Sequence, residues 1–168
     1  MLKALSVRNY VLIDSLETGF PEGLIIITGQ TGAGKSIILG ALSLLMGAKA
    51  DASAIADGAD SCVVEGVFSA PGDGALLRLL EENDVEDGGG ELTIRRVVNR
   101  SGRSRAFIND CPVNLPLLTS VTSRLVDIHS QHQNLALAER QFQLSALDLY
   151  AGTGSLLKEY GEAYGRLR

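Results

Sequence analysis

The segment GQTGAGKS at residues 29–36 matches the phosphate-binding loop pattern G-x-x-x-x-G-K-[ST] at every defined position. The run before it, Leu24 to Thr28, is short and apolar, which predicts a strand buried on both faces. The run after it, Ile37 to Met46, is an apolar helix-forming segment that Gly47 should end. Phosphate-binding loops occur between a strand and a helix in this order, so the sequence predicts a nucleotide site here.

Each residue type in this loop has a part in phosphate binding. Glycines lack a Cβ, so backbone N–H groups can converge on phosphate oxygens, and the helix dipole adds partial positive charge. We expect Lys35 to reach the β- and γ-phosphates of ATP and the Ser36 hydroxyl to bind Mg²⁺. The nucleotide contacts predicted from this segment are Gly29, Gln30, Thr31, Gly32, Ala33, Gly34, Lys35, Ser36 and Ile37.

Composition narrows the class of protein. A chain of 168 residues, 45% of them hydrophobic, is long enough for one ordinary core and short for two domains. No apolar run reaches bilayer length and no signal peptide is evident, so we expect a cytoplasmic protein without a membrane partner. Cys62 and Cys111 fit no metal spacing, in keeping with a reducing compartment. The net charge of −5 argues against strong nucleic-acid binding by this chain alone.

Charge is segregated along the chain. Acidic residues crowd between Glu81 and Glu91, and no acid occurs from Leu92 to Asn109. Two interpretations stand for the basic residues that follow: a hairpin with arginine-rich edges, or a patch facing the phosphates of DNA or of the nucleotide. The arginines are Arg95, Arg96, Arg100, Arg103 and Arg105.

Outside the loop, periodicity and turn residues predict further elements. Helices are expected at Gly74–Asn83, Leu115–Arg124 (capped by Asn114) and Glu139–Tyr150, with a loop at 51–60. At the C-terminus, apolar residues spaced three, four and three apart indicate a coiled-coil seam or an amphipathic helix packed on the domain; they are Leu157, Tyr160, Tyr164 and Leu167. Strands are expected at Leu2–Val7, Val11–Phe20, Cys62–Ser69, Leu92–Arg100, Arg105–Ile108 and Leu125–Ile128.

Motifs needed for hydrolysis are missing from the chain. A phosphate-loop ATPase normally has a run of four apolar residues that ends in an Asp, and this Asp completes the Mg²⁺ shell. Only Asp127 and Asp148 come near this pattern: the run before Asp127 is too short, and Asp148 lies in a helical pattern. No LSGG-type signature and no N-K-x-D guanine-binding motif occurs. The sequence therefore predicts nucleotide binding without turnover by this chain alone.

Four stretches resemble the RecN family of DNA repair proteins, which are SMC-like ATPases of the ABC type. They are LKALSVRNYVLIDSLETGFPEGLIIITGQTGAGKSIILGALSLLMG, RSRAFINDCPV, LVDIHSQHQNLAL and LSALDLYAG, and the resemblance runs through essentially the whole chain. It implies an α/β fold of the P-loop NTPase class: the N-terminal lobe of an ABC/SMC-type head, with a mixed central sheet and an antiparallel β portion. It also implies that residues 1–152 form this half of the head and residues 153–168 begin a truncated coiled-coil helix.

The resemblance implies a function and partners. A RecN-type ATPase acts in double-strand-break repair and recombination, with ATP and Mg²⁺ held between two heads whose engagement controls DNA association. The implied partners are DNA double-strand-break ends, the C-terminal half of the same head, and a second head that joins by ATP-dependent dimerisation. The implied location is the bacterial cytoplasm, in association with the nucleoid.

The resemblance also implies further site residues. Gln131 is expected to bind Mg²⁺ and to take part in catalysis, with Gln133 as the alternative. Asn9, in the first turn, is expected to contact the nucleotide. His129 and His132 lack a third metal ligand and are interpreted as loop residues.

Two other functional classes stay open. One is a small-molecule P-loop kinase that uses Arg100, Arg103 and Arg105 as a lid over the transferred phosphate. The other is a non-catalytic, nucleotide-dependent module that binds DNA or protein without turnover.

Overall fold

The computed structural model describes residues 1–28, 34–70, 74–128 and 140–166. The chain forms two units, Met1–Asp127 and Ile128–Arg168, which are described separately below. The predicted phosphate-loop helix and most of the predicted strands belong to the first unit.

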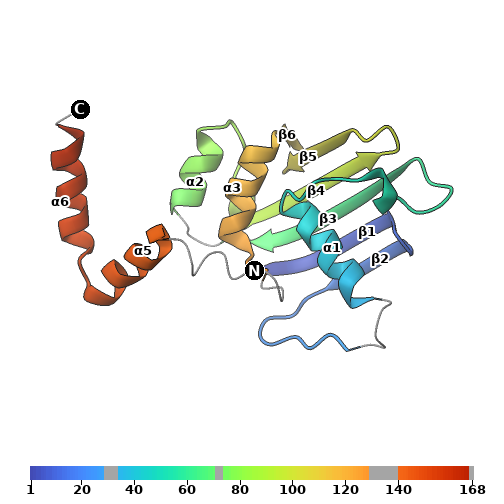
Figure 1. Cartoon of the computed structure of the whole chain (residues 1–168), viewed down its shortest axis with the longest axis horizontal. Helices are drawn as coiled ribbons and strands as arrows, with labels where there is room; N and C mark the ends of the chain where they lie inside the picture. The colour runs from blue at the N-terminus through green and yellow to red at the C-terminus, as the bar shows by residue number, and fades with distance from the viewer. Residues whose placement is uncertain (29–33, 71–73, 129–139, 167–168) are drawn as a thin grey trace. The chain divides into compact units, whose positions relative to one another are not determined.

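The first unit is built on a six-stranded sheet with the order β2-β1-β3-β4-β5-β6 (Figure 1). Every pair of neighbouring strands is antiparallel, which confirms the predicted antiparallel portion; no parallel pair occurs in the described part of this sheet. The strands are β1 Leu2–Tyr10, β2 Ile13–Gly19, β3 Ser61–Ser69, β4 Glu91–Asn99, β5 Ser104–Ile108 and β6 Cys111–Val113.

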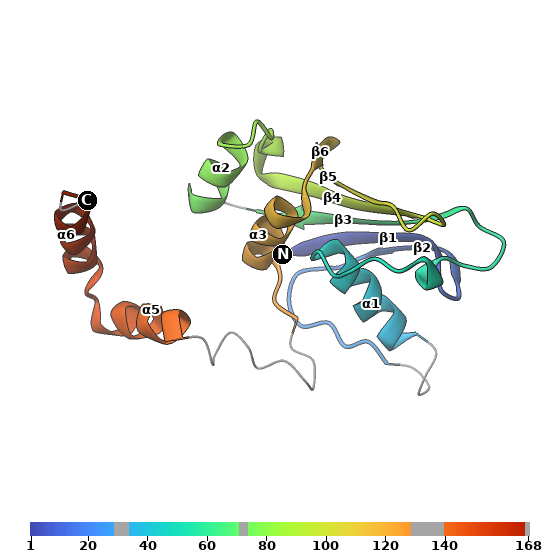
Figure 2. The same cartoon turned by 45° about the horizontal axis from the view of Figure 1, so that its top comes forward.

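Alternation along β3 and β4 produces one apolar face on the sheet. Side chains such as Cys62 and Val64 on β3, and Leu92, Ile94 and Val98 on β4, are fully buried there. Helices α1 and α3 lie over this face, and α2 packs beside α3 (Figures 1 and 2). The helices are α1 Lys35–Leu45, α2 Gly74–Glu81 and α3 Leu115–Leu125.

Both long helices of this unit end or begin where the sequence predicts. The Asn114 side chain accepts a hydrogen bond from the Leu117 N–H at 2.9 Å, so Asn114 caps α3 as expected. Gly47 has φ +97° after the last turn of α1, and its N–H donates to the Leu44 carbonyl at 3.2 Å. A left-handed glycine is a common helix stop, which confirms the predicted end of α1.

The prediction of a buried strand at Leu24–Thr28 is wrong. The segment has no regular structure, and Leu24 and Ile26 are 90% and 75% exposed. A strand buried on both faces needs other elements packed on both of those faces, and in the described structure this run pairs with none of the six strands. An apolar surface of four consecutive residues is therefore exposed between β2 and α1.

Two other details differ from the sequence prediction. Residues 126–128 form no strand, because α3 continues through Leu125 and covers part of the predicted segment. Strand β6 was not predicted, since it is only three residues long and contains Pro112, which is tolerated at a sheet edge. Asn109 and Asp110, both with positive φ, form the turn before it and were the available signal.

The second unit contains two helices, α5 Arg140–Ala151 and α6 Gly154–Gly165. Helix α5 falls where a helix was predicted at Glu139–Tyr150. On α6, the rings of Tyr160 and Tyr164 stack with centroids 6.0 Å apart and both side chains are exposed. In the part of the chain that the structure describes, no helix combines the length and apolar character needed to cross a bilayer.

We expect Ile94→Ala to lower the free energy of unfolding by about 2–5 kcal/mol, because Ile94 is fully buried and its truncation leaves a cavity. Urea unfolding monitored by circular dichroism measures this change. The matched control is Leu12→Ala, whose side chain is 80% exposed and should change stability by less than about 0.5 kcal/mol. Equal losses in both variants would contradict the observed core.

Ile26→Ser tests the exposed segment. We expect the free energy of unfolding to stay within about 0.5 kcal/mol of the parent chain, because the side chain has little buried surface to lose. A loss greater than about 2 kcal/mol in the same urea experiment would show that the run is buried after all.

Candidate functional site

The candidate site is centred on the N-terminus of α1, which begins at Lys35 directly after Gly34. The N-cap residue Gly34 has no side chain that could accept a hydrogen bond from the first turn. The partial positive charge of this helix end therefore faces outward, and Ser36, in the first turn, is exposed. Ile37 is half-buried against the core, which anchors the helix start.

Gly34 is not required by the protein's own packing. Its φ is −127°, which any residue can adopt, and a Cβ built there would meet no atom within 4 Å. Among the described residues, neither a positive φ nor a neighbouring atom requires glycine at this position. The space beside Gly34 is compatible with the close approach of a phosphate to the backbone.

Several predicted site residues lie outside the described residues. Within the phosphate loop these are Gly29, Gln30, Thr31, Gly32 and Ala33, and Lys35 is described only as the first residue of α1. The glutamines Gln131 and Gln133, and the histidines His129 and His132, also lie outside. Among the described residues, no cluster of three or more His, Cys, Asp or Glu side chains could hold a metal.

Asn9 is near the end of β1, beside the β1–β2 turn at Val11 and Leu12, and this region (called the Asn9 turn below) is fixed by contacts with the segment after α1. The Asn9 amide donates to the Ser61 carbonyl at 3.3 Å, the Asn9 carbonyl accepts from the Ala56 N–H at 3.0 Å, and the Val11 N–H donates to the Ala54 carbonyl at 2.8 Å. Asn9 and Val11 both have positive φ, at 52° and 53°. For a β-branched residue such as Val11 this conformation is strained, and such strain is typical of functional sites.

Tyr10 links this turn to the phosphate-loop helix. Its side chain is buried, burial raises the pKa of its hydroxyl, and its ring lies against α1. A Cβ at Gly40 would lie 2.8 Å from the Tyr10 Oη, so a larger residue at position 40 would displace the Tyr10 hydroxyl from its present place. The Asn9 turn is therefore held at a fixed position relative to α1.

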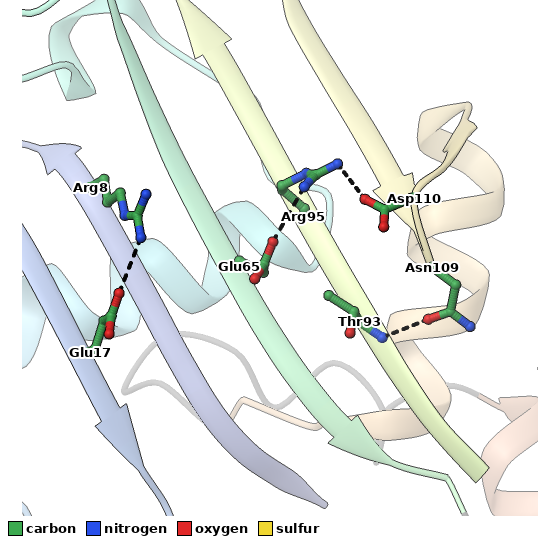
Figure 3. A network of polar contacts seen from close by, with 7 residues as sticks. All are labelled: Arg8, Glu17, Glu65, Thr93, Arg95, Asn109 and Asp110. Carbon is green, nitrogen blue, oxygen red and sulfur yellow. Dashed lines mark hydrogen bonds and ion pairs between the residues drawn. The ribbon is translucent and has the colours of Figure 1, made fainter. Parts of the chain in front are cut away.

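The arginines between residues 95 and 105 do not form one patch. Arg95 lies on the face opposite the core, 2.6 Å from the Asp110 carboxylate and 3.6 Å from Glu65 (Figure 3). Its guanidinium also lies over the Phe107 ring. Arg100 donates to the Ala59 carbonyl at 2.6 Å. Arg96 is buried on the core face, a position that strand alternation with Ile94 and Val98 could have indicated.

The outer face of the sheet carries ion pairs in strand register. Arg8 on β1 and Glu17 on the adjoining β2 form a 3.1 Å ion pair (Figure 3). The pair is diagonal, because the residue directly opposite Arg8 is Ser15. Glu65 and Arg95 lie directly opposite on β3 and β4. These charges neutralise one another locally, so this face has the character of a solvated surface with paired charges.

Comparison with known proteins gives a consistent picture. A family model described as an AAA domain matches residues 4–148. The DNA repair protein RecN of Vibrio cholerae is 40% identical over 168 residues, covering 100% of this chain and 30% of the relative. RecN of Bacillus subtilis is 36% identical over 99% of this chain and 29% of its own length. The chain therefore spans about 30% of the length of the relatives it matches.

Solved structures show the same fold. A chain from a study of ATP-driven dimerisation and DNA-stimulated activation of SMC ATPases superposes with a TM-score of 0.58 at 18% identity, covering 87% of this chain and 90% of the other. The SMC head domain of Thermotoga maritima gives a TM-score of 0.53 at 26% identity over 73% of this chain and 41% of its own. The predicted class, an α/β lobe of an ABC/SMC-type P-loop head, is confirmed. The predicted resemblance to RecN is confirmed as well, and the chain belongs to the AAA domain family.

Proposed function

We propose that this chain is the ATP-binding half of a RecN-type ATPase head that acts in DNA double-strand-break repair and recombination. The observation that carries the proposal is the start of α1, where Gly34 precedes Lys35 and a Cβ at Gly34 would meet none of the described residues within 4 Å. A complete phosphate-loop sequence at this helix end, together with the structural likeness to an SMC ATPase, supports ATP as the ligand.

Within the proposed site, each residue has a separate task. Backbone N–H groups of residues 29–34 and the Lys35 ammonium hold the triphosphate, and Asn9 contacts the nucleotide from the first turn. Ser36 and Gln131 would hold Mg²⁺, which supplies charge neutralisation at the β- and γ-phosphate oxygens when bound. The chain's contribution is therefore positioning and electrostatic stabilisation of the phosphates rather than covalent chemistry.

Completion of the site requires parts from elsewhere. The C-terminal half of the same head supplies the signature and acidic motifs, and a second head closes over the nucleotide by ATP-dependent dimerisation. On this proposal, the isolated chain binds ATP without hydrolysing it. In the full-length protein, head engagement controls association with DNA ends in the nucleoid of the bacterial cytoplasm.

The exposed run between Leu24 and Ile27 supports this division of the head. Four consecutive apolar side chains directly before the phosphate loop have no strand neighbour in the described part of this chain. Packing of the C-terminal half against this run would remove an apolar surface that the described part of this chain leaves exposed. Residues 1–152 then form one half of the head, and residues 153–168, with exposed Tyr160 and Tyr164, begin the coiled coil.

The alternative functions differ in how well the structure fits them. A non-catalytic nucleotide-dependent module describes the isolated chain well, because the acidic motif is missing from its sequence. A small-molecule kinase is disfavoured, because Arg100, one of its proposed lid residues, is held by the Ala59 carbonyl through its side chain and by Asp60 through its backbone.

Lys35→Ala should reduce ATP affinity at least about a hundredfold, because the ammonium is the one side-chain cation expected on the β- and γ-phosphates. Isothermal titration calorimetry of the 168-residue chain with a non-hydrolysable ATP analogue and Mg²⁺ measures the affinity. Lys158→Ala, an exposed lysine on α6, is the matched control and should bind as the parent does. Unchanged affinity in the Lys35 variant would refute its assignment.

Gln131→Ala in the full-length protein should lower the rate of ATP hydrolysis about a hundredfold while leaving ATP affinity within about threefold, as expected for a residue that positions water and metal. Gln133→Ala provides the comparison and should retain most of the rate. Steady-state phosphate release, with nucleotide affinity measured in parallel, distinguishes the two. The reverse order of effects would transfer the role to Gln133.

A further inference from the structure

A cavity of about 570 Å³ lies at the β5–β6 edge of the sheet, beside the start of α3. It is lined by residues of β4, β5, β6 and α3, and none of them is acidic. No residue of the candidate nucleotide site lines it. The polar groups in its wall are those of Arg96, Ser104, Arg105 and Asn114.

Arg96 is the unusual residue in this wall. It is 1% exposed, and none of its three guanidinium nitrogens has a hydrogen-bond partner among the described residues. The Ser104 Oγ is also buried and unpartnered. Arg96 on β4 lies opposite Ala106 on β5, and Ser104 is two residues before Ala106. Residues two apart on a strand share a face, so the Arg96 and Ser104 side chains lie near one another on the same face.

The neighbouring arginines show what Arg96 lacks. Arg95 has two carboxylates within reach and Arg100 has a backbone carbonyl. Burial lowers the pKa of Arg96, yet a guanidinium keeps its proton at neutral pH. The nearby Cys62 supplies no counter-charge, because burial raises the pKa of its thiol. A buried, unpaired charge is strongly unfavourable, so binding of an anion beside Arg96 would be stabilising.

The start of α3 adds to the positive potential. Asn114 and Leu115 line the cavity, so the positive end of an 11-residue helix dipole lies at its wall. The Asn114 side chain already caps Leu117, and Pro116 has no N–H, so the helix contributes through its dipole rather than through free donors. Arg105 also borders the cavity, but it is exposed and alternation along β5 places it on the opposite face of the sheet from Ser104.

We propose that this cavity is a second phosphate-binding site, separate from the phosphate loop. One buried guanidinium, one hydroxyl and a helix end on the same face of the sheet together favour an oxyanion such as phosphate. The phosphate group is either free inorganic phosphate or the terminal phosphate of a short nucleic acid, which present the same chemistry to Arg96 and Ser104. This inference does not depend on the proposed ATPase function.

Thermal unfolding of the 168-residue chain tests the proposal, with inorganic phosphate titrated at constant ionic strength. Because the phosphate loop also attracts phosphate, the experiment is done in the Lys35→Ala background. We expect a saturable rise in melting temperature of about 3–6 °C at roughly ten times the dissociation constant. Adding Arg96→Met should abolish the rise, whereas adding Arg103→Met, which changes an exposed arginine outside the cavity, should preserve it.

Two further measurements sharpen the result. Ser104→Ala, a mild substitution, should weaken phosphate binding several-fold and keeps the test valid if Arg96→Met fails to fold. Comparing a 5′-phosphorylated oligonucleotide with its unphosphorylated counterpart separates the sources of phosphate. An Arg96-dependent preference for the phosphorylated form identifies a nucleic-acid terminus, and its absence alongside stabilisation by inorganic phosphate identifies the free ion.

Three outcomes would overturn the proposal. The first is that phosphate does not raise the melting temperature in the Lys35→Ala background. The second is that the rise persists after Arg96→Met. The third is that Arg96→Met and the Arg103→Met control reduce the rise equally.

Discussion

Packing of α1 against the apolar face of the sheet is the constraint on which the rest of the structure depends. Ala41, Leu44 and Leu45 are buried in the same core as the inward-facing residues of β3 and β4. This contact fixes the direction of the helix and so the place where its positive N-terminus lies. The close approach of Tyr10 to Gly40 then sets the Asn9 turn relative to that helix end. The proposed phosphate site is thus positioned by the packing of α1 in the core rather than by contacts among the site residues themselves.

Sequence reasoning succeeded where local pattern and tertiary environment agree. Alternation in β3 and β4, the Asn114 cap of α3 and the glycine stop after α1 are local signals that the core reinforces. It failed at Leu24–Thr28, because an apolar run indicates that burial is favourable but does not identify the part of the protein that would cover it. It also missed β6, whose three residues are too few for a periodic signal. For the site, the motif indicated Gly34 and Ser36, but only the structure shows that a Cβ at Gly34 would meet no described atom within 4 Å.

Two adjacent arginines on β4 have different environments, because successive residues of a strand point to opposite faces of the sheet. Arg95 and Arg96 are neighbours in sequence, yet one lies among carboxylates on the outer face and the other lies in the core without a counter-charge. The cluster of basic residues in the sequence left two interpretations open, a hairpin with arginine-rich edges and a patch facing phosphates. The register of β4 instead divides them between a neutralised surface and a buried cation that requires an anion. Two places in one small unit therefore favour phosphate, one through a helix and loop and the other through a buried guanidinium.

The most direct test of the central claim is a ¹H–¹⁵N correlation spectrum of the ¹⁵N-labelled chain, recorded with and without a non-hydrolysable ATP analogue and Mg²⁺. If the start of α1 binds the triphosphate, the largest amide shifts should occur at Gly34, Lys35 and Ser36, with smaller shifts at the Asn9 turn. Unchanged amides at α1, or shifts confined to other elements, would contradict the account.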